Sequence, residues 1–318
     1  MADYASEKGV KVQTVAGDPP APFEGQVWYN SSTGSHRVNK GALVSAWSTG
    51  GDLNTPRYAL GGAGVQTAII VWSGYGSGLG FRTETESYNG STWTEVNDLN
   101  TARTESGGAG TSVSALAISG YSPGSPTNAL TELWNGTNWT EVNDLGTATY
   151  DIGSSGADNT SALGFGGNSR PTGQTELWNG TNWTEVNDLS RGSGGSVGGV
   201  GTSTATLCMG GGAETESWNG TNWTEVNDLN AGRSDSSYGG TQTSALLGGG
   251  SGFTTATESW NGTNWTEVND LSLGRNDLAD KGGTSNLSAI AVGGNTPGST
   301  AATEEWSETG GNQSVASS

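Results

Sequence analysis

The side chains that could do chemistry in this chain are mainly carboxylates, and most recur at fixed positions. A glutamate stands two residues before an aromatic residue at Glu86, Glu132, Glu176, Glu216, Glu258 and Glu304. An Asp-Leu pair recurs at Asp52, Asp98, Asp144, Asp188, Asp228 and Asp270. Such carboxylates could bind a cation, but the ligands of one ion must converge on one point, and these residues are spread along the chain. We therefore expect each glutamate to accept backbone hydrogen bonds or to pair with an arginine, and each aspartate to cap a turn.

Other catalytic chemistry is poorly represented. The single histidine, His36, and the single cysteine, Cys208, exclude His-based metal sites, Cys zinc sites and disulfide frameworks. Cys208 lies in an apolar run and is expected to be buried, and His36 has no Ser-Asp pair nearby for a catalytic triad. A glycosidase would need two converging carboxylates, whereas the acids here are repeated. We predict no enzymatic activity, no catalytic residues, no metal and no cofactor.

A repeated unit must position these residues. The segment from Thr131 to Leu145 recurs letter for letter from Thr175 to Leu189, and close copies occur elsewhere. The second aromatic residue of each copy is Trp47, Trp93, Trp139, Trp183, Trp223 or Trp265, at spacings of 40 to 46 residues. The first is Tyr88, Trp134, Trp178, Trp218, Trp260 or Trp306. A period of this length is typical of repeat architectures.

Each unit predicts four strands. A Gly-rich segment and a short apolar run are followed by Thr-Glu-x-aromatic, an Asn-Gly turn and the segment WTEVNDL, and no window has a helical period. Asn-Gly favours a two-residue hairpin turn because both residues tolerate positive φ. Four strands in each of six units predict an all-β fold, a six-bladed β-propeller.

The ends of the array indicate how it closes. Trp47 has no first aromatic residue before it, and Trp306 has no second one after it. In an open array these half units would leave exposed sheet edges. We expect the N-terminal outer strand that carries Trp47 to pair with the C-terminal blade that carries Trp306.

Composition adds two expectations. The 55 glycines and the net charge of −19 favour disorder, but 11 of the 13 tryptophans occupy the two periodic positions. A buried aromatic side chain hides roughly 150–250 Å², worth on the order of 4–6 kcal/mol before entropy is counted, so we predict an ordered chain with glycines where the innermost strands crowd a channel. The negative charge excludes nucleic acid and anionic membranes as partners. No apolar stretch predicts a signal peptide, a transmembrane segment or other membrane insertion.

The repeat resembles the kelch unit of galactose-oxidase-like propellers, in which Arg and Gly-Gly precede an aromatic residue, Trp and Leu. The first unit matches at Arg57, Gly61, Gly62, Tyr88, Trp93 and Leu99, and the second at Arg103, Gly107, Gly108, Trp134, Trp139 and Leu145. The third unit has Thr149 in place of the arginine, and in the fourth the arginine is displaced to Arg191. The resemblance implies a fold and not an activity, because kelch propellers serve as enzymes, adaptors and scaffolds.

The N-terminal segment lacks the repeat. We expect a hairpin with one strand from Gln26 to Tyr29, a turn over residues 30–34 and a return through Val38. It resembles a short module near the head ends of tail-fibre and other virion proteins of tailed bacteriophages; the matching residues are Pro22, Glu24, Gly25, Gln26, Trp28, Tyr29, Asn30, Ser31, Thr33 and Gly34. The resemblance implies attachment to a particle, with Trp28 and Tyr29 as attachment residues. The alternative is a hairpin that merely caps the propeller. We divide the chain into an arm and hairpin (residues 1–40), of which about the first twenty residues are flexible, a propeller (residues 41–309) and a flexible tail (residues 310–318).

The loops that vary between units are the best candidates for binding. The connection between the second and third strands changes most, and it should emerge on the face opposite the Asn-Gly turns, beside the connections that follow each Asp-Leu pair. The candidate binding residues on this face are Tyr75, Phe81, Arg82, Tyr121 and Arg170. The alternative is that these loops simply tolerate change.

Three functions fit these observations. The first is a structural virion protein, localised to the viral particle, whose arm binds other virion proteins and whose propeller serves as a tail-fibre-like adsorption or decoration module that binds a host surface ligand or another virion protein. The second is a lectin-like propeller that binds a host surface glycan. The third is a kelch-type adaptor for a protein partner.

Overall fold

The computed structural model describes residues 12–19, 26–39, 44–169, 173–191, 195–279, 281–309 and 312–315. All regular elements among these residues are strands, which confirms the all-β class. The described residues form two compact units. The larger unit runs from Trp47 to Trp306, and the smaller unit contains the described residues up to Ala46 and from Ser307 onward.

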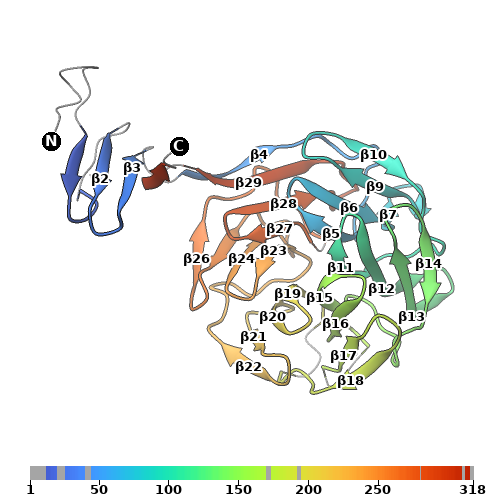
Figure 1. Cartoon of the computed structure of the whole chain (residues 1–318). Coiled ribbons are helices and arrows are strands. Elements are labelled where there is room, and N and C mark those ends of the chain that lie inside the picture. Colours follow the sequence, from blue (N-terminus) through green and yellow to red (C-terminus); the bar gives the residue numbers. More distant parts are fainter. Residues whose placement is uncertain are drawn as a thin grey trace. The chain divides into compact units, whose positions relative to one another are not determined.

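The described residues of the larger unit form six four-stranded sheets with antiparallel neighbours, arranged about a common centre (Figure 1). The first sheet contains β5 (Gly61–Val65), β6 (Ala68–Trp72), β9 (Thr85–Tyr88) and β10 (Trp93–Val96), and a short ribbon of β7 (Tyr75–Gly76) and β8 (Gly80–Phe81) lies in its loop. The second contains β11 (Gly107–Thr111), β12 (Ser114–Ser122), β13 (Ser125–Trp134) and β14 (Trp139–Val142). The third contains β15 (Gly153–Asp158), β16 (Ser161–Phe165), β17 (Thr175–Trp178) and β18 (Trp183–Val186).

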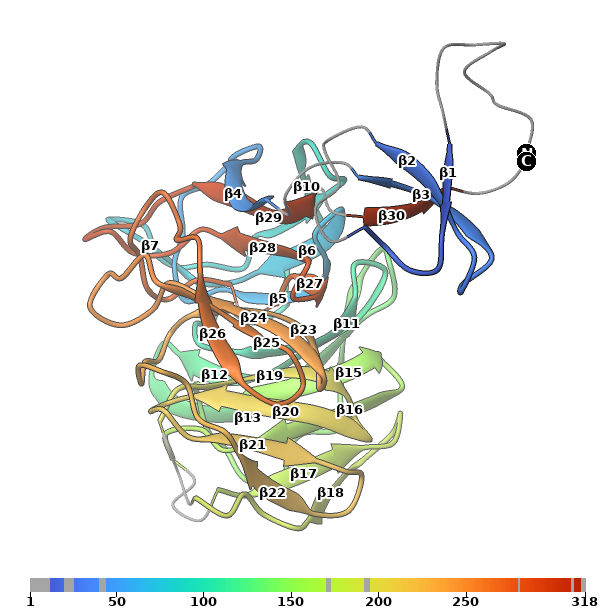
Figure 2. The same ribbon diagram turned by 90° about the vertical axis from the view of Figure 1, so that its left-hand side faces the viewer.

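The other three sheets follow the same order. The fourth contains β19 (Val197–Thr202), β20 (Ala205–Gly210), β21 (Thr215–Trp218) and β22 (Trp223–Val226). The fifth contains β23 (Ser237–Thr241), β24 (Ser244–Gly248), β25 (Thr257–Trp260) and β26 (Trp265–Val268). The sixth contains β27 (Gly283–Ser285), β28 (Ser288–Val292), β29 (Thr303–Thr309) and, as its outer strand, β4 (Val44–Thr49). An N-terminal strand therefore lies beside a C-terminal one, as the two half units of the sequence predict. Figure 2 shows the sheets from the side.

The outer hairpin of the first five sheets follows from its local sequence, but its loop has four residues and not the expected two, because only the glycine of Asn-Gly adopts a positive φ. In the second sheet the Asn135 side chain accepts hydrogen bonds from the backbone N–H groups of Thr137 and Asn138, both at 2.9 Å, and Gly136 adopts a φ of 91°. This turn places Trp134 directly opposite Trp139, with ring centroids 5.3 Å apart. The repeated turn thus brings two aromatic rings into tilted contact in each such hairpin.

The core lies between neighbouring sheets, and indoles join them. The N–H group of each second-position Trp donates to the Thr that begins the third strand of the preceding sheet. These pairs are Trp139–Thr85, Trp183–Thr131, Trp223–Thr175, Trp265–Thr215, Trp47–Thr257 and Trp93–Thr303, at 3.0 to 3.2 Å. The last pair joins the first sheet to the sixth. Leu53, Ile69 and Val71 also share a buried cluster with Ile290 and Val292 of the sixth sheet.

The repeated carboxylates have the structural roles expected of them. Each glutamate accepts a hydrogen bond from the backbone of the preceding Asp-Leu connection; for example, Glu86 accepts from the N–H group of Asn54 at 2.7 Å. Five glutamates form ion pairs with buried or half-buried arginines: Arg57–Glu86, Arg103–Glu132, Arg191–Glu216, Arg233–Glu258 and Arg275–Glu304, at 2.8 to 3.8 Å. The displaced arginine of the fourth unit therefore still reaches its glutamate. The aspartates accept backbone hydrogen bonds at the start of the third strand, as Asp144 does from Thr131 at 3.1 Å.

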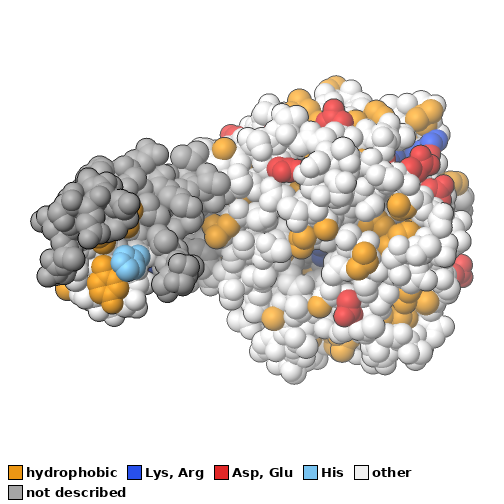
Figure 3. All heavy atoms as spheres, turned by 45° about the horizontal axis from the view of Figure 1, so that its top comes forward, with side chains coloured by type: hydrophobic (Ala, Val, Ile, Leu, Met, Phe, Trp, Pro, Cys, Tyr) orange, Lys and Arg blue, Asp and Glu red, His pale blue; other side chains and the backbone are white. Residues whose placement is uncertain are grey.

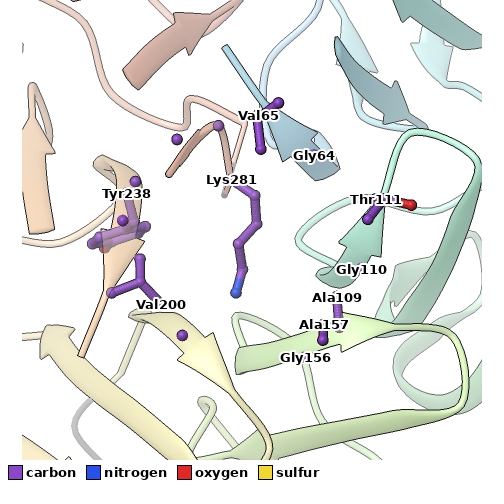
Figure 4. Close-up of a pocket in the computed structure, with 15 residues that line it drawn as sticks. Gly64, Val65, Ala109, Gly110, Thr111, Gly156, Ala157, Val200, Tyr238 and Lys281 are labelled. Carbon is purple, nitrogen blue, oxygen red and sulfur yellow. The ribbon is translucent and has the colours of Figure 1, made fainter. Parts of the chain in front are cut away.

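Glycines line the centre of the larger unit, where the first strands of the sheets meet. A Cβ atom added at Gly108 would overlap the carbonyl oxygen of Gly62 in the neighbouring strand, so no larger residue fits there. A cavity of about 170 Å³ remains at the centre. Lys281 extends into it (Figure 4), and its ammonium group donates to the backbone carbonyl groups of Ser154 and Gly199 on the other side. The expected crowding is confirmed, and a lysine fills part of the channel.

The smaller unit contains a four-stranded sheet in the order β1 (Gln13–Val15), β2 (Val27–Asn30), β3 (Ser35–Asn39) and β30 (Asn312–Val315). The strands β2 and β3 form the predicted hairpin. Two expectations need correction. Residues 13–15 of the expected flexible arm pair in parallel with β2, and residues 312–315 of the expected flexible tail pair with β3. The expected boundaries at residues 40 and 309 also differ from the division of the two units at Ala46 and Ser307.

Candidate ligand-binding cleft

The variable loops gather on one face of the larger unit. The connection between the second and third strands of a sheet lies beside the connection that enters its first strand, because residues of the two form isolated β-bridges. Examples are the bridges between Tyr58 and Tyr75 and between Thr104 and Tyr121. This arrangement is the one that the order of the strands predicts.

Five aromatic rings form a continuous row on this face. Tyr75 lies 5.5 Å from both Tyr58 and Phe81, measured between ring centroids. Phe81 stacks on Tyr121 at 5.7 Å with an interplanar angle of 10°, and Tyr121 meets the edge of Tyr150 at 6.1 Å. Each ring is partly exposed, and Tyr121 has the largest exposed fraction at 37%. Phe81 and Tyr121 cover part of each other by stacking, and the exposed remainder of the row presents aromatic surface to a ligand.

These rings line a cleft of about 340 Å³, together with Ala59, Thr104 and Glu105. The volume lies within the range of known small-molecule sites, and such sites combine aromatic walls with a few polar groups. The ribbon of β7 and β8 sets the position of two rings, because Tyr75 and Phe81 are partners in its register. Tyr121 extends from the end of β12, in the adjacent sheet. Tyr150 lies in the connection that enters the third sheet, so the cleft is built from loops of three successive sheets.

Among the ionisable groups that line the cleft, the carboxyl group of Glu105 has the most strongly shifted pKa. Burial, with smaller contributions from the nearby charges of Asp277 and Asp235, raises this pKa to about 7. Burial likewise raises the pKa of Asp277 to about 6, with Asp235 contributing. Glu105, Asp235 and Asp277 each follow an arginine by two residues and adopt a positive φ of 52° to 58°, so the same turn in three sheets brings their carboxylates toward one another.

The Glu105→Gln variant is expected to be more stable than the parent above pH 7. A carboxyl group whose pKa is higher in the folded than in the unfolded state lowers the free energy of unfolding when it ionises. This destabilisation is absent below the unfolded-state pKa, and it increases with pH until the pH exceeds the folded-state pKa. After allowance for the part of the side chain that solvent screens, the gain at pH 8 should be about 2 kcal/mol. Thermal unfolding at pH 8 and at pH 4 measures it, and an equal effect at both values would contradict this assignment.

The structure brings together three of the five predicted binding residues. Tyr75, Phe81 and Tyr121 line the cleft, whereas Arg82 forms an ion pair with Glu84. Arg170 lies outside the described residues. Sequence reasoning missed Tyr58, Tyr150 and Glu105. They occur in the connection after the Asp-Leu pair, where the residues that follow the arginine, or Thr149 in its place, differ between units, and this variation is a signal that could have found them.

The predicted attachment residues lie in the smaller unit. Trp28 is fully buried and donates a hydrogen bond to Asp18 at 3.1 Å, so it supports the sheet and does not offer its ring to a partner. Tyr29 is half-buried and packs on His36, with ring centroids 5.1 Å apart. Cys208 is buried, as expected, and its thiol accepts a hydrogen bond from Arg191.

Other hollows of the larger unit are less suited to an organic ligand. A more polar cleft of about 480 Å³ on the loop face is lined by Asp151, Asn168, Arg233 and Asp235, among others, and lacks aromatic walls. Among the described residues, no group of three His, Cys, Asp or Glu side chains is arranged to hold a metal ion. Within the same residues, no helix has the length and apolar character needed to cross a membrane. On the face seen in Figure 3, hydrophobic and acidic side chains are scattered and basic ones are few.

Comparison with known proteins supports the fold and goes no further. No protein-family model matches the chain, and no curated protein matches it in sequence. Among solved structures, that of YjhT is similar with a TM-score of 0.66 and 13% sequence identity, over 82% of this chain and 100% of that one. The likeness and the repeated four-stranded sheets support a β-propeller fold for the larger unit.

Proposed function

We propose that the larger unit is a six-bladed, kelch-like propeller closed by β4. Three observations support closure. The first strands β5 and β27 are neighbours, the indole of Trp93 bonds Thr303 across the junction, and Trp47 packs on Trp306 with ring centroids 5.5 Å apart. The kelch assignment rests on the repeated arginine, Gly-Gly and Trp positions.

We further propose that the propeller is a binding protein and not an enzyme, and that it takes a carbohydrate in the aromatic cleft. The observation that carries this proposal is the row of five rings, because the apolar faces of sugar rings pack on aromatic side chains while hydroxyl groups need a few polar partners. Tyr hydroxyl groups, Thr104 and Glu105 supply such partners at the same cleft.

The place of action that fits best is a bacteriophage particle. The proposal follows from the resemblance of residues 22–34 to modules of tailed-phage virion proteins, and the hairpin of β2 and β3 agrees with it. In this role the smaller unit binds other virion proteins, and the propeller binds a glycan on the host surface. A chain that lacks residues 1–39 should then keep its ligand but fail to enter particles; a partner protein bound equally well by both chains would favour an adaptor.

Substitution of Tyr121 by Ala should weaken carbohydrate binding about tenfold, which corresponds to about 1.4 kcal/mol. The ring stacks on Phe81 and forms the most exposed wall of the cleft, so its loss removes ligand contact without opening the core. A glycan array identifies ligands, and calorimetry measures the affinity of each variant.

Phe253→Ala is the matched control for this substitution. Phe253 is an aromatic residue of the fifth sheet's loop, 42% exposed and outside the cleft. Its removal should leave binding unchanged. Binding that survives Tyr121→Ala, or an array on which no glycan binds, would count against a carbohydrate site here.

A further inference from the structure

The walls of the aromatic cleft favour a positively charged ligand. The face of an aromatic ring carries partial negative charge and attracts ammonium groups, and this attraction is worth about 0.5–2 kcal/mol per contact. Five such rings and the Glu105 carboxyl group line one cleft of about 340 Å³. Neutral sugars would use the rings alone, whereas an ammonium group would use both the rings and the carboxylate.

The charges around the cleft also favour a cationic ligand. Burial, followed by the charges of Asp277 and Asp235, raises the pKa of Glu105, so the three carboxyl groups lie near one another in a partly desolvated region. A cation placed among them would relieve this repulsion, because an opposite charge within about 4–6 Å favours the ionised form of a carboxyl group.

Basic side chains near the cleft are already neutralised. Arg82 pairs with Glu84 beside the ribbon of β7 and β8. Arg103, next to Thr104 in the chain, is fully buried and pairs with Glu132. No lysine or arginine is among the described residues that line the cleft. An anionic sugar would therefore meet carboxylates without a compensating cation.

We infer that the cleft selects saccharides that carry a protonated primary amine, with the sugar packed on the exposed side of the aromatic row and the ammonium group directed to Glu105. This inference rests on the proposed carbohydrate function and narrows it to one class of ligand. A free ammonium group can pair with the carboxylate and also interact with the aromatic rings, whereas N-acetylation removes the charge and adds bulk.

Oligosaccharides of glucosamine and of N-acetylglucosamine, matched in length, test the inference by calorimetry with the full chain near neutral pH. We expect the glucosamine oligomer to bind the parent protein at least about tenfold more tightly, a difference of about 1.4 kcal/mol. The Glu105→Gln variant should lose this preference while its affinity for the acetylated oligomer stays the same. Thermal unfolding of the variant verifies that it is folded.

Glu95→Gln supplies the control for net charge. Glu95 is exposed on β10 and is not among the residues that line the cleft, and its substitution removes the same formal charge as Glu105→Gln. The Glu95→Gln variant should keep the full preference for the glucosamine oligomer. If both variants lost this preference equally, the cause would be long-range attraction by the net charge of the protein, and the assignment to Glu105 would be overturned. Equal or tighter binding of the acetylated oligomer would overturn the amine preference but leave the carbohydrate function intact. If neither oligomer bound and no glycan on the array bound, the carbohydrate function itself would be refuted.

Discussion

A chain that begins at residue 50 should lose most of its stability and aggregate, whereas a chain that begins at residue 40 should unfold like the parent. The shorter chain lacks β4, the outer strand of the sixth sheet. Trp306 is 1% exposed and packs on Trp47, which also contacts Leu271 and Leu278. Removal of a packed tryptophan side chain alone costs about 3–5 kcal/mol, and loss of the strand also leaves an unpaired sheet edge.

Urea unfolding followed by tryptophan fluorescence measures this difference. The expected result is a fall in the midpoint for the chain that begins at residue 50, with soluble oligomers or precipitate at higher protein concentration. The Trp47→Ala substitution in the full chain separates side-chain packing from strand loss, and its cost should be the smaller of the two. If both truncated chains unfolded at the parent midpoint, the closure that we propose through β4 would be wrong.

Substitution of Arg57 by Met should destabilise the protein by about 3–5 kcal/mol, because it leaves a buried carboxylate without its partner. The Arg57 side chain is fully buried, pairs with Glu86 at 2.8 Å and donates to the carbonyl group of Ser73 at 2.8 Å. Partial recovery is expected when Glu86→Gln is added, since that change removes the uncompensated charge.

Arg82→Met is the comparison within the same sheet. The Arg82–Glu84 pair is partly exposed, with 25% and 18% of the two side chains accessible, so its loss should cost no more than about 1 kcal/mol. Equilibrium unfolding of the single and double variants measures the three effects. Equal costs for Arg57→Met and Arg82→Met would contradict the role assigned to the buried pair.

The sequence predicted the repeated parts of the fold well because their causes are local. The side chain of the turn asparagine accepts hydrogen bonds from backbone N–H groups of the same turn, as Asn135 does from Thr137. Wherever this motif occurs, two aromatic residues therefore face each other across the hairpin, as Trp134 and Trp139 do. The phase difference between the two aromatic series also predicted that Trp47 meets Trp306. Residues 312–315 gave no such signal, since a polar segment becomes a strand only when a partner such as β3 pairs with it.

The candidate site was predictable in part. Tyr75, Phe81 and Tyr121 were found because their loops vary between units, but Tyr58, Tyr150 and Glu105 lie in the connections after the Asp-Leu pairs, whose variation was not used to select candidates. The sequence by itself determined the repeated strands, the period and the aromatic residues at the two repeated positions. The tertiary structure alone decided which loops face each other and which carboxyl groups lie close enough to raise one another's pKa, because both depend on how adjacent sheets are rotated and packed and not on neighbours along the chain.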